Sequence, residues 1–371
     1  MRIGIDARMM SARATRGIGR YIEELIRAML VSAPSNRYVL ITRSALHPFA
    51  THPSVETRVA DIPWYGLEEQ LRLPFIFRAL RADVIHVPHW NAPLFYNGPL
   101  VITVHDLLLR HQPNSARIST RSALVAAVKR LGFRIVLSRA IVHAYKILVP
   151  SNFVADDVAR FFPKAAQKIV ITGEGITRRT TFPTVLENKP PRSEYLLYVG
   201  SAYPHKGLDT LIDAWAELSA RHCNLRLKIA GSEDVFMQRL KESVQRRNLQ
   251  RVDFLGFVKD EELNKLYQEA LVFVFPSNFE GFGLPPLEAI RAGCPVVSSD
   301  AGALPEVIGE DNAFFFQAGS RNAILQAIEG VLSDPEAARK KSLRAAPSLL
   351  ARHNWEAAAV KTLDAYKTFL K

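Results

Sequence analysis

The sequence contains little cysteine. Cys223 and Cys294 are the only two among 371 residues, they lie far apart, and neither has a CxxC partner. This usage excludes a disulfide framework and a thiolate metal site, and it is typical of a protein in a reducing cytoplasm. We expect both cysteines to be small buried residues.

Long apolar runs are also missing. The longest contain about six residues, as in ALVFVF (270–275), whereas a membrane-spanning helix needs roughly 20. The N-terminus, MRIGIDARMM, reads as a strand and lacks the apolar core of a signal peptide. We therefore expect a cytoplasmic protein, and the sequence leaves export by another route open.

No Asp-x-Asp pair occurs anywhere in the chain. A magnesium ion that bridges a diphosphate usually needs closely placed carboxylates, so the sequence offers no anchor for one. His86 and His89 have an HxxH spacing, but no cysteine or third ligand lies near them, which argues against zinc. We expect no metal and no cofactor.

Positive charge is concentrated in the first half of the chain. Residues 1–190 contain 26 Lys and Arg against 13 Asp and Glu, whereas residues 191–371 contain 22 against 23. A basic half beside a neutral half indicates an anionic partner, such as a phospholipid surface, a pyrophosphate-linked carrier or a nucleic acid. A basic face without a partner is the alternative.

Strand-like and helix-like periods alternate along the chain. In the first half, MRIGIDA, NRYVLIT, ADVIHVPH, GPLVITVHD and YKILVPS read as strands, with an amphipathic helix at 17–33. In the second half, strands are expected in EYLLYVG, NLRLKIAG, RVDFLGF, LVFVFPS, CPVVSSD and AFFFQ, with helices at 205–222, 259–269 and 284–292. This alternation predicts parallel sheets covered by helices on both faces.

Residues 186–193, LENKPPRS, interrupt the pattern with two prolines and mixed charge, as a linker does. We therefore predict an α/β protein of two doubly wound, Rossmann-like domains, residues 1–185 and 186–353, that face each other across a cleft. Residues 354–371 read as a final helix with Asn354 as its N-cap. We expect this helix to pack back on the first domain.

The stretch FEGFGLPPLE (279–288) follows a buried strand and carries the strongest signal. Pro285 and Pro286 are typical of the first turn of a helix, and Gly281 and Gly283 fall just before it. Glycines there let backbone N–H groups approach a ligand, and a helix N-terminus favours anions. The stretch predicts a phosphate or sugar site at the carboxyl end of a strand.

The two glutamates of this stretch are too far apart to act as one catalytic pair. Eight helical residues rise about 12 Å, whereas a glycosidase carboxylate pair needs roughly 5–9.5 Å. We expect Glu280 and Glu288 to hold different parts of one extended ligand, a sugar and a ribose diol. The alternative is two exposed glutamates beside a turn.

Two further loops follow predicted strands. In VGSAYPHKG, Lys206 lies near a helix N-terminus, where basic charge is unfavourable unless an anion is bound, so it is a candidate to neutralise a diphosphate. In TRGIGRY, Gly17 and Gly19 open a helix, a weaker phosphate signal. Solvent-exposed or purely structural roles are the alternatives.

His105 and Asp106 fall at the end of the predicted strand VITVHD. A neutral His105 imidazole there would hydrogen-bond a sugar hydroxyl. Alternatively, it would stabilise a positive charge that develops on the substrate, by way of the carbonyl group to which the ring is hydrogen-bonded. The alternative is a core histidine.

In this order, these clusters resemble family 4 of the retaining, nucleotide-sugar-dependent glycosyltransferases, which have the GT-B fold. FEGFGLPPLE matches the family's E-x7-E signature, and GIGRY, VHDL, VPSNF, VGSAYPHKG, FLGFV and PVVSSDAGALPEVIG match lesser landmarks across nearly the whole chain. Where many relatives carry an arginine, this chain has His205 and Ser201, so neutralisation of the diphosphate would rest on Lys206 with help from residues such as Arg20.

The resemblance implies roles for these residues. Glu280 and the amides that follow it would hold the donor sugar, Glu288 the ribose, Lys206 the diphosphate, and Phe257 and Val258 would border the base. His105 would contact the sugar near its anomeric carbon. The expected catalytic residues are His105, Lys206 and Glu280. The expected donor-site residues are Gly17, Gly19, Gly200, Ser201, His205, Lys206, Phe257, Val258, Glu280, Gly281, Phe282, Gly283, Leu284 and Glu288. The expected acceptor-side or supporting residues are Arg20, His89 and Asp106.

We therefore expect a metal-independent, retaining hexosyltransferase. Sequences with GIDAR, GIGRY and HD resemble mannosyltransferases of surface-polysaccharide assembly, which implies GDP-mannose as donor and a glycan or lipid-linked acceptor. Two alternatives stay open: a GT-B enzyme that uses UDP-sugars, or epimerises or phosphorolyses sugars, and a non-enzymatic protein that binds a membrane or nucleic acid. No aromatic-interleaved basic motif supports nucleic-acid binding.

A membrane contact is expected in the first domain. Residues 107–155 carry eight Lys and Arg and no acidic residue. Leu124, Val128, Leu131 and Ile135 form an apolar stripe at helical spacing, which predicts peripheral contact with an anionic membrane. The alternative is that this stripe belongs to the domain core.

Overall fold

The computed structural model describes residues 1–10, 17–112, 123–176 and 194–368. The side chains of 123–127 and of residue 129 lie outside this description. The chain divides into two compact units. Unit 1 contains residues 1–107, 123–175 and 353–368, and unit 2 contains residues 108–112, 176 and 194–352.

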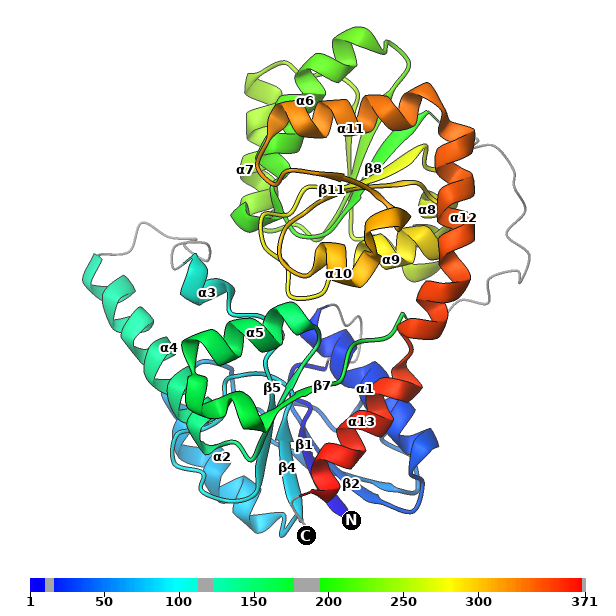
Figure 1. Cartoon of the computed structure of the whole chain (residues 1–371). Helices are drawn as coiled ribbons and strands as arrows, with labels where there is room; N and C mark the ends of the chain where they lie inside the picture. Colours follow the sequence, from blue (N-terminus) through cyan, green and yellow to red (C-terminus); the bar gives the residue numbers. More distant parts are fainter. Residues whose placement is uncertain (11–16, 113–122, 177–193, 369–371) are drawn as a thin grey trace. The chain divides into compact units, whose positions relative to one another are not determined.

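Unit 1 is built on a parallel sheet with the strand order β3-β2-β1-β4-β5-β6-β7 (Figure 1). Its strands are β1 Arg2–Asp6, β2 Arg37–Thr42, β3 Val55–Val59, β4 Val84–Val87, β5 Leu100–Thr103, β6 Lys146–Val149 and β7 Ile169–Ile171. Its helices are α1 Ile18–Ser32, α2 Leu67–Ala79, α4 Ala123–His143, α5 Asn152–Phe161 and α13 Trp355–Lys367, with a 3-10 turn, η1, at Pro163–Lys168.

Alternate residues of the central strands supply two separate cores. On β2, Tyr38 and Leu40 are buried in the core that α1 and α13 cover. Val39 and Ile41 point to the opposite face and are buried in the core that α2, α4 and α5 cover. Successive side chains of a strand point to opposite faces, so a sheet buried on both sides needs a nearly continuous apolar run.

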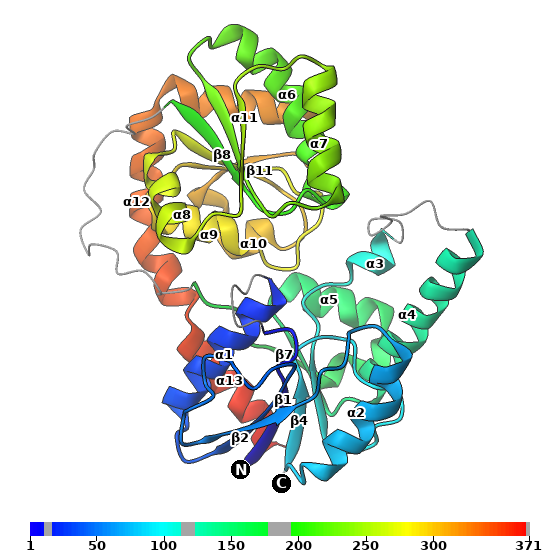
Figure 2. The same cartoon turned by 180° about the vertical axis from the view of Figure 1, so that it is seen from behind.

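The last helix, α13, packs beside α1 on unit 1 (Figures 1 and 2). The side chain of Asn354 accepts a hydrogen bond from the backbone N–H of Ala357 at 2.7 Å. Asn354 is therefore the N-cap of α13, as predicted. Near the end of α13, the Tyr366 hydroxyl lies 2.7 Å from His86 Nδ1 in the sheet. The chain thus returns to unit 1 after it has built unit 2.

Unit 2 repeats the same strand order, β10-β9-β8-β11-β12-β13. Its strands are β8 Tyr195–Val199, β9 Arg226–Ala230, β10 Val252–Gly256, β11 Val272–Phe275, β12 Val296–Ser299 and β13 Phe314–Phe316. Its helices are α3 Leu108–His111, α6 Leu208–Arg221, α7 Val235–Arg246, α8 Asp260–Glu269, α9 Leu284–Arg291, α10 Leu304–Ile308, α11 Arg321–Ser333 and α12 Pro335–Arg352, with 3-10 turns η2 at Pro204–Lys206 and η3 at Glu310–Asn312. Helices α6 and α11 lie side by side, and α9 contacts α8 and α12 (Figure 2).

In both units the order reverses beside the first strand, between β1 and β4 and between β8 and β11. Such a switch point opens a crevice at the carboxyl ends of the strands, where doubly wound sheets bind ligands. The loops after these four strands therefore decide where each unit can bind a ligand.

All the strands expected from the sequence are present, but β3 and β7 were not predicted. Both lie at an edge of the unit 1 sheet and are partly exposed, and β7 has only three residues. The expectation for cysteine is half wrong, because Cys294 is buried but Cys223 is exposed. Within the described ranges, every helix is too short or too polar to cross a bilayer.

Candidate active site

The FEGFGLPPLE stretch forms the loop after β11 and the first turns of α9. The helix begins at Leu284, so Pro285 and Pro286 lie in its first turn, as predicted. Gly283 is the N-cap, with φ of 98°. This left-handed backbone is favourable for glycine and strained for other residues. Gly281, Phe282 and Gly283 are buried at the carboxyl end of β11.

Glu280 and Lys206 form the centre of the unit 2 site. Lys206 Nζ lies 2.6 Å from Glu280 Oε1, and both side chains are mostly buried, with 20% and 12% of their surface exposed. The hydroxyl of Ser277 donates to the same carboxylate oxygen at 2.6 Å. The structure therefore joins two predicted catalytic residues that lie far apart in the sequence.

Backbone contacts hold the two loops of this site together. The N–H of Asn278 donates to the carbonyl of His205 at 2.7 Å, and the N–H of Ala303 donates to the carbonyl of Glu280 at 3.0 Å. A Cβ on Gly302 would lie 2.3 Å from the Glu280 carbonyl oxygen, so only glycine allows this approach. The site is thus preorganised by close backbone packing.

The loop that carries Lys206 begins directly after β8. Gly200 and Ser201 open it, and the Tyr198 hydroxyl donates to the Ser201 carbonyl at 2.7 Å. Gly207 ends it with φ of 69°, and a Cβ there would lie 1.9 Å from the carbonyl oxygen of Pro276. This turn places Lys206 beside the loop that follows β11.

His205 is a neutral side chain in this site. Burial, and next the positive charge of Lys206, lower its pKa to about 4. Its Nδ1 is buried and has no hydrogen-bond partner. A buried polar atom of this kind indicates a place for a missing partner, here directly beside the lysine expected to bind phosphate.

Glu288 and Phe257, two further predicted donor-site residues, also belong to unit 2. Glu288, in α9, accepts a hydrogen bond from the Tyr267 hydroxyl at 3.4 Å. Phe257 follows β10 and is 51% exposed, whereas Val258 is buried. Glu280 and Glu288 therefore have different neighbours, Lys206 and Ser277 for the first and Tyr267 for the second.

In unit 1, His105 forms an ion pair that the sequence did not predict. His105 Nδ1 lies 3.1 Å from Glu174 Oε1, and Nε2 lies 3.2 Å from the carbonyl oxygen of Pro88. Burial lowers the pKa of His105, but the Glu174 carboxylate, the Pro88 carbonyl and the charge of Asp106 outweigh it, and the net shift is upward. Two acceptors favour a doubly protonated ring, so the neutral imidazole that we expected does not fit this geometry.

The two HxxH histidines have buried positions. Both ring nitrogens of His86 have partners, Thr103 Oγ1 at 2.9 Å and the Tyr366 hydroxyl, which makes His86 a satisfied core residue. Burial, and secondarily the charge of His105, lower the pKa of His89 to about 3. His89 accepts the N–H of Asn91 at Nδ1, so its neutral ring carries the proton on Nε2.

Gly17, Gly19 and Arg20 lie at the start of α1. Gly17 is the N-cap, with φ of 56°, and a Cβ added to it would meet nothing within 4 Å. Gly19 is buried and Arg20 is partly exposed. The six residues before Gly17 lie outside the described part. Of this predicted phosphate loop, the structure therefore describes only Gly17 and the start of α1.

Ser277 and Glu174 are the site residues that sequence reasoning missed. Ser277 belongs to the turn after β11. The residues PSN (276–278) predict this turn, so the sequence could have indicated Ser277 as a site residue. Glu174 lies between two glycines after the short strand β7, and nothing in that pattern points to a histidine 69 positions earlier.

Comparisons with known proteins identify the relatives of this chain. Residues 15–178 match the family model described as Glycosyltransferase Family 4, and residues 185–346 match that for Glycosyl transferases group 1. O-antigen chain mannosyltransferase B of Escherichia coli is 33% identical over 388 aligned positions, covering 95% of this chain and 96% of that protein. O-antigen chain mannosyltransferase RfbU of Salmonella typhimurium is 26% identical, covering 77% of this chain and 75% of that protein.

The solved structure of sucrose-phosphate synthase from Thermosynechococcus elongatus has the same fold. It superposes with a TM-score of 0.81 at 24% identity, over 100% of this chain and 99% of that chain. The two family matches and the relative that is similar over nearly the whole chain indicate the same family, and the two parallel sheets fit its fold. The chain therefore belongs to family 4 of the glycosyltransferases, has the GT-B fold and is a glycosyltransferase.

Proposed function

We propose that the protein transfers mannose, with retention of anomeric configuration, from GDP-mannose to a glycan or lipid-linked acceptor in surface-polysaccharide assembly. The contact between Lys206 and Glu280 carries this proposal, because it places a cation for a diphosphate beside a carboxylate for sugar hydroxyls. The choice of mannose is supported by the O-antigen mannosyltransferase that is similar over nearly the whole chain.

Donor binding would exchange one ion pair for another. Without a ligand, the Lys206 ammonium is paired with Glu280 at 2.6 Å. A diphosphate carries more charge and binds ammonium through strong charge-assisted hydrogen bonds, so it would draw Lys206 away. Glu280, still held by Ser277, would then accept hydrogen bonds from the sugar.

The reaction breaks the bond between the anomeric carbon and the diphosphate oxygen, and it forms a bond from that carbon to the acceptor hydroxyl oxygen. Lys206 and the N-terminus of α9 stabilise the charge that develops on the leaving diphosphate. The acceptor attacks from the same face, and its proton passes to the leaving phosphate oxygen. No protein base is needed, and we propose that no metal takes part.

His105 is assigned to the transferred sugar. Its ring is fixed by Glu174 and Pro88 and lies at 86° to the ring of Tyr21, with 4.6 Å between their centres. Because Glu174 and Pro88 occupy both ring nitrogens, a sugar hydroxyl would have to replace the Pro88 carbonyl at Nε2 in order to accept a hydrogen bond from His105.

The test measures transfer from GDP-mannose, UDP-glucose and UDP-N-acetylglucosamine to a panel of glycan and lipid-linked acceptors, with and without EDTA. We expect release of GDP only with acceptor, an α-mannoside from the α-linked donor by NMR, and full activity in EDTA. A β-linked product would overturn retention, preference for a UDP-sugar would overturn the donor, and inactivation by EDTA would overturn metal independence.

A membrane contact is the second part of the proposal. The predicted stripe on α4 does not belong to the core at the positions on view: Val128, Leu131 and Ile135 are 63%, 59% and 50% exposed. Leu124 lies among the side chains outside the description. Arg130 and Arg134 on the same helix are also exposed, as an anionic surface requires.

Helix α2 adds apolar side chains that the sequence did not single out. Leu67, Leu71 and Phe75 recur every four residues and are 83%, 58% and 71% exposed. Helices α2 and α4 cover the same face of the unit 1 sheet, since their buried residues share one core. Exposed apolar groups of this extent, accompanied by cations, are typical of a surface that contacts a membrane.

Flotation with phosphatidylglycerol vesicles tests this contact. We expect the wild type to float with these vesicles and not with neutral ones, and a variant with Val128, Leu131 and Ile135 changed to Ser to lose flotation. The control is Val360→Ser on α13, where valine is 48% exposed. Unchanged flotation of the triple variant would contradict the proposal.

A further inference from the structure

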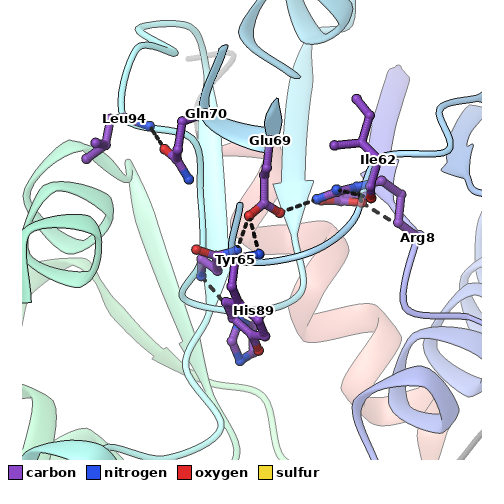
Figure 3. Close-up of polar contacts among 9 residues, drawn as sticks. Arg8, Ile62, Tyr65, Glu69, Gln70, His89 and Leu94 are labelled. Atoms are coloured by element: carbon purple, nitrogen blue, oxygen red, sulfur yellow. Dashed lines mark hydrogen bonds and ion pairs between the residues drawn. The ribbon is translucent and has the colours of Figure 1, made fainter. Parts of the chain in front are cut away.

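The switch point of unit 1 contains a buried ionic network at the ends of β1 and β4 (Figure 3). The Arg8 guanidinium donates to both carboxylate oxygens of Asp6 at 2.8 Å, to Glu69 at 2.6 Å and to the carbonyl of Ile62 at 3.0 Å. The side chains of Arg8 and Glu69 are 1% and 0% exposed. These charges are fully paired inside the protein, so they support the site and do not themselves meet a ligand.

Glu69 uses its other oxygen to hold two loops. Its Oε2 accepts the backbone N–H of Tyr65 at 2.8 Å and the side-chain amide of Asn91 at 2.6 Å. The neighbouring Gln70 accepts the N–H of Leu94 at 2.8 Å. The first turn of α2 therefore fixes both the loop before it and the loop after β4 (Figure 3).

Tyr65 is held in a conformation that a tyrosine rarely adopts. Its φ is +60°, a left-handed value that is unfavourable for residues with a Cβ. Its side chain is nevertheless 61% exposed, so burial of the ring does not explain the strain. Strain that surrounding structure enforces is concentrated at functional sites, and here the Glu69 network enforces it.

The strained residue completes an aromatic surface. The ring of Tyr65 stacks with Trp90, 5.8 Å between centres at 30°, and lies 5.9 Å from the ring of His89. Trp90 is supported from behind by Phe133, edge-on at 4.8 Å. We call Tyr65, His89 and Trp90 the aromatic platform.

Polar donors at the platform are uncharged. His89 is neutral and carries its proton on Nε2. The indole N–H of Trp64 is buried without a partner, and the residue lines a small cavity together with Asp6, Arg8 and His89. A neutral histidine beside an exposed aromatic ring matches a ligand that has hydroxyl groups and C–H faces but no charge.

We propose that the aromatic platform of unit 1 binds the pyranose ring of the acceptor, with the exposed ring of Tyr65 against its C–H face and Trp90 supporting that ring, and that Glu69 is the positioning residue for Tyr65. The inference rests on the proposed transfer to a saccharide. It is drawn from three features that coincide at one switch point: an exposed tyrosine stacked on Trp90, a neutral histidine beside it and a buried network that maintains a strained backbone.

The decisive variant is Tyr65→Gly. Glycine adopts the left-handed backbone without strain, so this variant keeps the fold and its melting temperature is unchanged or raised. Removal of the ring is expected to weaken acceptor binding about tenfold or more, seen as a higher acceptor KM with an unchanged donor KM. Tyr65→Phe keeps the stacking surface and is expected to stay within about twofold of the wild type. Leu46→Ala, at a 76% exposed position between β2 and β3, is the control.

Direct binding separates this inference from the proposed function. Saturation-transfer NMR with methyl α-mannoside, methyl α-glucoside and α-mannobiose measures saccharide binding without any transfer. The inference is supported if at least one sugar binds the wild type and binds Tyr65→Gly about tenfold more weakly, even if GDP-mannose proves to be the wrong donor. Binding of no sugar by the wild type, equal binding by Tyr65→Gly, or loss of vesicle flotation in Tyr65→Gly with an unchanged acceptor KM would each overturn it.

Discussion

The switch points of the two units occupy the same place in the same strand order, yet they contain opposite kinds of charge arrangement. In unit 2, Lys206 and Glu280 are paired but remain 20% and 12% exposed, between loops rich in glycine. In unit 1, Arg8 and Glu69 are 1% and 0% exposed and are enclosed by hydrogen bonds. The first arrangement can exchange its partner for an ionic ligand. The second cannot, and it acts by shaping an uncharged surface.

Arg8→Ala is expected to have the largest effect of the variants that compare the two sites. It leaves Asp6 and Glu69 as buried carboxylates without their cation, and breaking a buried pair in this way costs about 3–5 kcal/mol. Chemical denaturation would measure a loss of unfolding free energy of that size. A loss below about 1 kcal/mol is the value for an exposed pair. It would contradict the buried position of Arg8 and Glu69 in this structure.

Lys206→Ala is expected to affect activity rather than stability. Removal of one group that stabilises transition-state charge typically lowers kcat about 10²–10³-fold, whereas Glu280 keeps its bond from Ser277. Steady-state kinetics and thermal melting would be measured on the same preparation. Near-wild-type turnover would contradict the role of Lys206, and a large drop in melting temperature would place it with Arg8 as a structural residue.

Gly302→Ala tests the close packing around Glu280. A Cβ there would lie 2.3 Å from the Glu280 carbonyl oxygen, and φ is +61°, so we expect a loss of about 1–3 kcal/mol in stability together with reduced donor affinity. Gly330→Ala in α11 is the matched control, since nothing lies within 4 Å of its added Cβ. It is expected to gain about 0.5–1 kcal/mol. Equal effects of the two variants would rule out preorganisation by Gly302.

The smallest expected effect concerns pH. The pKa of His105 is raised in the folded state, so its pair with Glu174 contributes stability that is fully present below the ordinary value of 6.5 and is lost as pH rises through the raised pKa. Glu174→Gln is expected to flatten this part of the profile of unfolding free energy against pH. Parallel profiles for the wild type and the variant would show that the pair is not linked to folding.

The sequence predicted the unit 2 site far better than the unit 1 site, and there is a physical reason. Glycine, proline and charged residues just past a strand determine the local backbone and charge by themselves. The sequence of FEGFGLPPLE and the position of Lys206 were therefore enough to predict a ligand site. Arg8, Tyr65 and Glu69 are joined across the fold, and a charged residue is by default expected on the surface. Of the aromatic platform, only His89 was predicted from the sequence, as an acceptor-side or supporting residue.

The fold shows the same division between local and tertiary causes. The central strands have continuous apolar runs because both of their faces are buried, and all of them were predicted. Strands β3 and β7 are edge strands with exposed or few residues, which weakens the pattern. The predicted N-cap Asn354 and the start of α9 at the two prolines depended on one or two residues each and were found in place.

The return of α13 to unit 1 has a consequence for biosynthesis. Trp355, Leu363 and Tyr366 complete a core that otherwise consists of residues from the first half of the chain. During translation, the second Rossmann-like unit is therefore finished while the first still lacks its covering helix. Emergence of α13 from the ribosome, and not emergence of residue 175, sets the earliest moment at which this core can close.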